Sequence, residues 1–158
     1  MVASLPADSN APPVLVREAI RLAQHADDKW DALRQSGALL EELVAVEVGY
    51  AAAILEREGQ ISTYMGEGVA IPHGTDEARA LVRRTALGFL QYPDGVDWDG
   101  EKVRACIAIA ARSDEHTDVM ARLATVLLDG EKAELLRSTD RPDDVLDLLE
   151  PSAERSPS

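Results

Sequence analysis

Apolar residues at helical spacing predict helices in the first part of the chain. In DKWDALRQSGALL they recur every three to four positions, which predicts a helix near 28–42 with an aspartate capping its first turn. A second helix is predicted from about Glu47 to Glu58. Gly59 follows as its expected left-handed terminator, because glycine adopts that conformation without steric cost.

The centre of the chain has the pattern of strands. TALGFLQYP and VRACIAIAAR are near-continuous apolar segments, typical of strands covered on both faces. The turn-rich PDGVDWDG between them is too short to include a helix, so a hairpin is predicted. Upstream, 69–71 form a short extended run, and Pro72 cannot continue a central strand. His73 is therefore expected just beyond a strand end.

The helical pattern returns after Arg112. Ser113 and Asp114 form an expected capping pair before a helix that has His116 in its first turn. Two short helices are predicted near 131–138 and 142–149, the second with proline at its first position. Helices around a central set of strands favour the α/β class.

The ends of the chain differ from its middle. Residues 1–13 contain three prolines, and 151–158 read PSAERSPS, so both segments are predicted to be flexible tails. One folded domain is expected over 14–150.

Charge narrows the range of partners. The chain of 158 residues has a formal net charge of −13, which opposes attraction to nucleic acid and to anionic membrane surfaces. Because no apolar segment is long enough to insert into a bilayer and the N-terminus does not resemble a signal peptide, we expect a cytoplasmic location. Cys106, the only cysteine, is expected to be a small buried side chain. No cofactor is expected, and no metal site, because the histidines lack paired ligand spacing.

His73 is the candidate for chemistry. A neutral imidazole is nucleophilic, and its unperturbed pKa near 6.5 leaves much of it neutral at pH 7. Gly66, Gly68 and Gly74 lie around it, which would let the backbone of a partner approach. From these residues alone, a hydrogen-bonded surface histidine beside a turn remains the alternative.

Two separated segments resemble a known family. LEREGQISTYMGEGVAIPHGTDEARALVRRTALGFLQYPDGV resembles the active-site region of mannitol-type enzyme IIA domains of the bacterial sugar phosphotransferase system, in which the histidine of PHG is phosphorylated. IAIAARSDEHTDVMARLATVL is similar to the family's second signature, where a histidine opens a helix beside the first one. The resemblance extends more loosely over 14–150. It implies an α/β fold with a mixed, mainly parallel five-stranded sheet and helices on both faces.

The resemblance also assigns site residues. It implies that His73 carries the phosphoryl group, on Nε2, and that His116 orients it; a solvent-facing residue at a helix start is the alternative for His116. Arg57, in EREG, matches the family's arginine and would offset the phosphoryl charge, unless it is a solvated residue at a helix end. Arg112 is its substitute.

The residues after His73 complete the candidate set. Gly74 and Thr75 are candidates to contact the phosphoryl group, as the family's HGT segment suggests, although threonine after a turn is commonly a cap. His25 matches neither signature and is expected to lie in an exposed loop.

The implied function is that of a phosphotransferase component. By resemblance, the chain accepts phosphate from phospho-HPr and passes it to a cysteine of a cognate enzyme IIB for mannitol or another hexitol. The alternative is a regulatory module that senses phosphotransferase flux by protein binding. A protein-binding scaffold without phosphoryl transfer is the third interpretation.

Overall fold

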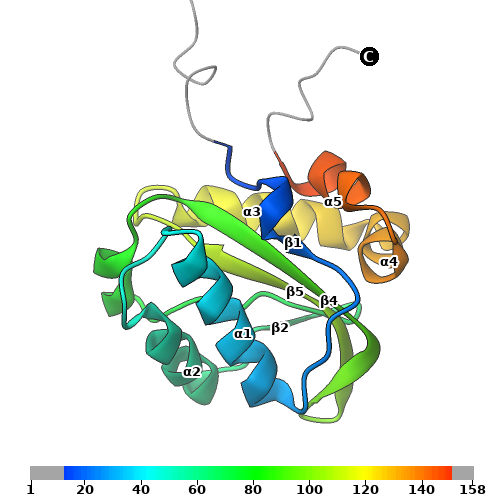
Figure 1. The fold of residues 1–158 in the computed structure, drawn as a ribbon, viewed down its shortest axis with the longest axis horizontal. Helices are drawn as coiled ribbons and strands as arrows, with labels where there is room; N and C mark the ends of the chain where they lie inside the picture. Colours follow the sequence, from blue (N-terminus) through cyan, green and yellow to red (C-terminus); the bar gives the residue numbers. More distant parts are fainter. Residues whose placement is uncertain (1–12, 151–158) are drawn as a thin grey trace, which may run out of the picture.

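The computed structural model describes residues 13–150 and shows a five-stranded sheet between two layers of helices. Along the chain the elements are η3 (Arg17–Ala19), β1 (Ile20–Arg21), α1 (Lys29–Glu42), α2 (Tyr50–Gln60), β2 (Tyr64–Gly66), β3 (Val69–Ala70), η4 (Glu77–Leu81), β4 (Ala86–Trp98), β5 (Glu101–Ala110), α3 (His116–Leu128), α4 (Gly130–Ser138) and α5 (Pro142–Leu149). The α/β class expected from the sequence is confirmed (Figure 1).

The sheet is mixed, with the strand order β1-β4-β5-β3-β2. β1 pairs with β4 and β3 with β5 in parallel, whereas β4 pairs with β5 and β2 with β3 antiparallel. The expectation of a mainly parallel sheet is therefore wrong: parallel pairs are only half of the set, and the longest ladder, β4·β5, is antiparallel. Short connections explain this, because strands joined by a tight turn must run in opposite directions.

The β4–β5 hairpin is longer than the sequence suggested. The strands extend through most of the expected turn segment, and only Asp99 and Gly100 connect them. Both have positive φ, +55° and +97°, as a two-residue turn that matches the twist of the strands requires. A register shift between Gln91 and Val96 accommodates the Pro-Asp-Gly sequence within β4.

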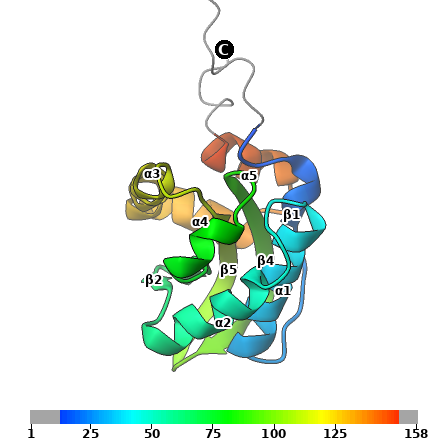
Figure 2. The same ribbon diagram turned by 90° about the vertical axis from the view of Figure 1, so that its left-hand side faces the viewer.

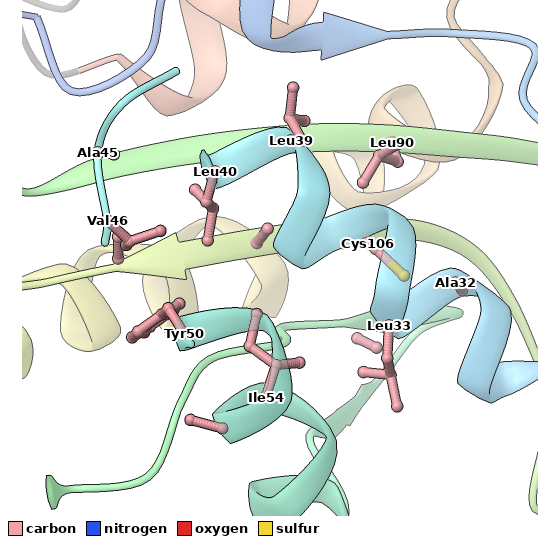
Figure 3. Packing of buried hydrophobic residues seen from close by; sticks show 14 of the residues in the cluster. Ala32, Leu33, Leu39, Leu40, Ala45, Val46, Tyr50, Ile54, Leu90 and Cys106 are labelled. Carbon is pink, nitrogen blue, oxygen red and sulfur yellow. The ribbon is translucent and has the colours of Figure 1, made fainter. Parts of the chain in front are cut away.

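Helices cover both faces of the sheet, as expected (Figures 1 and 2). On one face, α1 and α2 bury a cluster that includes Leu33, Leu40 and Ile54 against the sheet (Figure 3). Leu123 of α3, Leu136 of α4 and the apolar side of α5 bury a second cluster on the other face. Two separate cores fix the central strand β5 from both sides, and His73 pairs with a residue of that strand.

Several predicted boundaries are confirmed and others are wrong. Asp28 caps α1 by accepting a hydrogen bond from the Asp31 backbone, and α5 begins at Pro142. Gly59 does not end its helix, because α2 continues to Gln60 with Gly59 in helical conformation.

The start of α3 also differs from the prediction. Its N-cap is Glu115, without a side-chain capping bond, so Ser113 and Asp114 do not cap it. The short edge strands β1 and β2 were not predicted, because strands of two and three residues have too little pattern of their own. The segments 1–12 and 151–158, which include nearly all of the expected tails, lie outside the described residues.

Candidate functional site

His73 lies where the chain leaves the sheet. β3 ends at Ala70, and three residues later His73 forms an isolated parallel bridge with Ile109 of β5. The Ile109 N–H donates to the Pro72 carbonyl over 2.8 Å, which fixes the backbone directly before the histidine. The predicted position just beyond a strand end is confirmed.

The His73 ring is oriented by one hydrogen bond. Nδ1 lies 2.8 Å from the Ile71 carbonyl oxygen, and since a carbonyl only accepts, Nδ1 must be the donor. In the neutral ring the lone pair is therefore on Nε2. Within residues 13–150 every buried polar side-chain atom has a partner, and Nε2 has none, so Nε2 must contact solvent although only 7% of the residue is exposed.

His116 faces the same ring. It is the first residue of α3 and is half-buried, and its ring centroid lies 5.6 Å from that of His73 with the ring planes tilted by 53°. Burial is the main reason that the pKa of each histidine lies below its usual value. Both shifts favour the neutral form of the ring.

Two guanidinium groups act on the histidine pair. The charges of Arg57 and Arg79 add to burial in lowering the pKa of His73 and of His116, whereas Asp76 raises that of His116. Arg57 occupies the last turn of α2 and donates to the Ile61 carbonyl over 2.6 Å. The structure thus brings Arg57 to the site, together with Arg79.

Arg79 was missed by the sequence reasoning. Its guanidinium forms an ion pair with Asp76 at 2.9 Å on the short 3-10 helix η4. This helix has no apolar periodicity from which it could be predicted. The one available signal was its closeness in sequence to the PHG triplet. Arg112, the expected substitute for Arg57, is exposed and donates instead to the Arg83 carbonyl.

The two residues after His73 have hydrogen-bond partners within the chain. The Gly74 N–H donates to the Tyr50 hydroxyl, and the Thr75 hydroxyl accepts from the Ala78 N–H at the start of η4. Thr75 therefore supports the first turn of η4 from the position before its N-cap, Asp76. Contact of Gly74 or Thr75 with a phosphoryl group stays a prediction.

The surface at η4 has two hollows, and neither is lined by His73 or His116. A cavity of about 560 Å³ is lined by residues that include Asp76, Glu77, Arg79 and Arg112. A second one, of about 490 Å³, shares the two acidic residues and adds Arg57. Side chains of both signs border the site, which suits a charged group delivered by another protein.

The remaining candidates lie outside the site. His25 is exposed and bonded to Asp27, as expected. Cys106 is fully buried, and burial raises the pKa of its thiol. Gly66 and Gly68 have positive φ at the β2–β3 turn, and the approach of a partner there stays a prediction. Within 13–150, no three side chains of His, Cys, Asp or Glu gather as ligands of a metal ion would.

A comparison with known families identifies the chain. Residues 14–152 match the family described as phosphoenolpyruvate-dependent sugar phosphotransferase system, EIIA 2. The chain belongs to this family. As an EIIA protein of type 2, it is a phosphocarrier and a phosphotransferase component of that system.

Relatives of this EIIA chain agree with that assignment. It is 38% identical over 136 residues to the mannitol-specific phosphotransferase enzyme IIA component of Halalkalibacterium halodurans, covering 86% of this chain and 94% of that one. Among solved structures, it matches the complex of enzyme IIAMTL and phosphorylated enzyme IIBMTL from Escherichia coli with 40% identity and a TM-score of 0.78, covering 84% of this chain and 94% of that chain. It also matches the nitrogen regulatory protein IIA-Ntr of Neisseria meningitidis with 25% identity and a TM-score of 0.73, over 86% and 96% of the two chains.

In the described part of this EIIA chain, none of the helices has both the length and the apolar character needed to cross a bilayer.

Proposed function

We propose that Nε2 of His73 accepts the phosphoryl group from phospho-HPr and passes it to a cysteine of a cognate enzyme IIB for mannitol uptake, in the cytoplasm. The observation that carries this proposal is the state of the His73 ring. Its Nδ1 is the donor to the Ile71 carbonyl, so Nε2 has the lone pair and contacts solvent.

The transfer needs a nucleophile in the correct protonation state. Burial lowers the pKa of His73, which keeps the ring neutral at pH 7. The Nε2 lone pair attacks phosphorus while the bond from phosphorus to the nitrogen of the donor breaks, and that nitrogen keeps the bonding electrons. In the second step the thiolate of the acceptor attacks phosphorus, and Nε2 recovers its lone pair.

The arginines supply the opposing charge. A phosphoryl group adds nearly two negative charges to a chain that already has a net charge of −13. Arg57 and Arg79 are close enough to lower the pKa of the His73 ring, and their positive charge favours an anion on Nε2. We assign Arg57 as the principal phosphate-stabilising residue and His116 as the group that orients the phosphohistidine.

The mannitol system is favoured over a regulatory role by similarity. Identity is 40% with the mannitol IIA of the Escherichia coli complex and 25% with the nitrogen regulatory protein. That complex contains enzyme IIB, which supports a IIB protein as the acceptor. The HPr donor is supported by membership in the phosphotransferase family.

The decisive experiment is labelling with phosphoenolpyruvate, enzyme I and HPr. Wild-type protein is expected to gain one acid-labile, base-stable phosphate, and the His73→Ala variant to gain none. His25→Ala is the matched control, because His25 is exposed and distant from the motifs, and it should label normally. Label on His73→Ala would show that the carrier residue is another one.

A chase experiment distinguishes the transport role from the regulatory role. After removal of HPr, the labelled protein is mixed with a mannitol enzyme IIB, and the label is expected to move to the IIB cysteine. Retention of the label on His73 in the presence of that IIB would replace the transport role by the regulatory one.

A further inference from the structure

Tyr50, which neither sequence motif includes, bonds both to β5 and to the segment that follows His73. It is the first residue of α2 and is 3% exposed. Its hydroxyl accepts a hydrogen bond from the Gly74 N–H at 3.0 Å and donates one to the Ile109 carbonyl at 2.9 Å. Gly74 follows His73 in the chain, and Ile109 is the residue opposite His73 in the sheet.

The hydrogen-bond pattern of a parallel ladder explains these two bonds of Tyr50. In such a ladder, one residue bonds through its N–H and its C=O to the two residues that flank its partner. The Ile109 N–H follows this rule and donates to Pro72, the residue before His73. The matching bond would join the Gly74 N–H to the Ile109 carbonyl, and the Tyr50 hydroxyl bonds both of these groups. The hydroxyl is thus inserted into the ladder at the point where His73 leaves the sheet.

Gly74 makes room for the insertion. A Cβ at this position would lie 2.8 Å from Cε1 of Tyr50, closer than real Cβ contacts, and 3.0 Å from Cζ, which is tight. Burial raises the pKa of Tyr50, so its hydroxyl keeps the proton that it donates to Ile109. The glycine of the PHG triplet is therefore explained by the tyrosine that packs on it.

We propose that Tyr50 is a positioning residue for phosphoryl transfer: its hydroxyl spaces the His73–Gly74 segment from β5 and so sets the His73 ring against His116. This inference rests on the proposed function of His73. Without the hydroxyl, the buried Gly74 N–H and Ile109 carbonyl lose their partner, and the segment must shift. A small displacement of a reacting group lowers a transfer rate strongly, because the nucleophile is then no longer aligned with the phosphorus atom.

The test compares Tyr50→Phe with Tyr92→Phe. Tyr92 is also buried, in the same core, and its hydroxyl bonds Gln35 away from the histidines, so its variant controls for loss of a buried hydroxyl. For Tyr50→Phe we expect the rate of phosphorylation by saturating phospho-HPr to fall about tenfold. The KM for phospho-HPr should stay unchanged, because Tyr50 is not on the surface. Tyr92→Phe should keep the wild-type rate.

Two nuclear magnetic resonance measurements test the position directly. In Tyr50→Phe, the Gly74 amide is expected to exchange with solvent at least about tenfold faster and the ring nitrogen resonances of His73 to move, both without change in Tyr92→Phe. Wild-type values for the rate, the Gly74 exchange and the His73 resonances in Tyr50→Phe would overturn the proposal. So would an equal loss of rate in both variants. The resonance measurements need no phosphoryl donor, so wild-type protein that takes no label would refute the proposed function and leave this test in place.

Discussion

Two neighbouring residues of α2, Arg57 and Glu58, belong to two polar regions that are built in opposite ways. Glu58 is buried and its carboxylate is fully occupied. Oε1 accepts from the backbone N–H and the hydroxyl of Thr63 at 2.9 and 2.5 Å, and Oε2 accepts from the Trp98 indole at 3.0 Å. Lys29 lies 3.5 Å from Oε2 and also bonds Asp99. We call Glu58 and the four residues joined to it the Glu58 cluster: Lys29, Glu58, Thr63, Trp98 and Asp99.

Arg57 belongs to the histidine site, where one ring nitrogen is left without a hydrogen-bond partner. His73 uses Nδ1 for the Ile71 carbonyl and leaves Nε2 without a partner. His116, opposite, is half-buried at the start of α3. The charge of Arg57 acts on both rings.

The two regions have different roles: the Glu58 cluster stabilises the fold, and the histidine site performs chemistry. A closed network such as the Glu58 cluster joins α1, α2, the residue before β2 and the β4–β5 hairpin, and each buried polar side-chain atom in it has a partner. The histidine site keeps one ring nitrogen available, while the backbone on either side of His73 is held by the Tyr50 hydroxyl and by the bond from β5. We therefore expect changes in the two regions to affect different measurements.

The largest expected effect is on stability, from Glu58→Ala. The change leaves the Thr63 N–H and the Trp98 indole N–H buried without an acceptor, and should lower the free energy of unfolding by about 3 kcal/mol or more. Glu56→Ala is the control, because Glu56 is exposed on the same helix. Urea unfolding measures both variants. Labelling by phospho-HPr under folding conditions should remain close to wild type, and a loss of stability under about 1 kcal/mol would show that the cluster is not a stabilising network.

His116→Ala should give the reverse pattern. Removing this ring takes away the group that faces His73, and we expect the rate of transfer to enzyme IIB to fall about tenfold, equivalent to about 1.4 kcal/mol, while label is still accepted. Thr117→Ala, an exposed change in the same turn of α3, is the control. Stability should change little in either variant. A transfer rate equal to wild type would remove His116 from the mechanism.

The sequence predicted those features of the fold and of the histidine site that depend on residues close together in the chain. The α/β class, the strand end before His73 and the place of His116 in the first turn of a helix all follow from contiguous strings, and α5 was predicted with its bounds. Two motifs in order were enough to place the family.

What the sequence could not supply is carried by contacts between distant segments. Tyr50 reaches Gly74 and Ile109, which are 24 and 59 residues away, and nothing in its own helix indicates those partners. β1 is defined only by its pairing with β4. The sheet is not mainly parallel, because strands joined by a hairpin run antiparallel. Arg79 lies on a short 3-10 helix, which has no hydrophobic periodicity from which it could be predicted.

The smallest expected effect is a pH dependence confined to the histidine site. Burial is the largest cause that lowers the pKa of His73, and Arg57, His116 and Arg79 lower it further, against the bond to Ile71, which raises it. The unfolded chain, with a pKa near 6.5, then binds more protons than the folded one at pH values from about 6.5 down to the lowered pKa. The stability that His73 contributes should be complete above pH 6.5 and decline as the pH falls through that window. Urea unfolding of wild type and His73→Ala at several pH values measures it: the difference between them should shrink on acidification, and two parallel curves would contradict a neutral, buried ring.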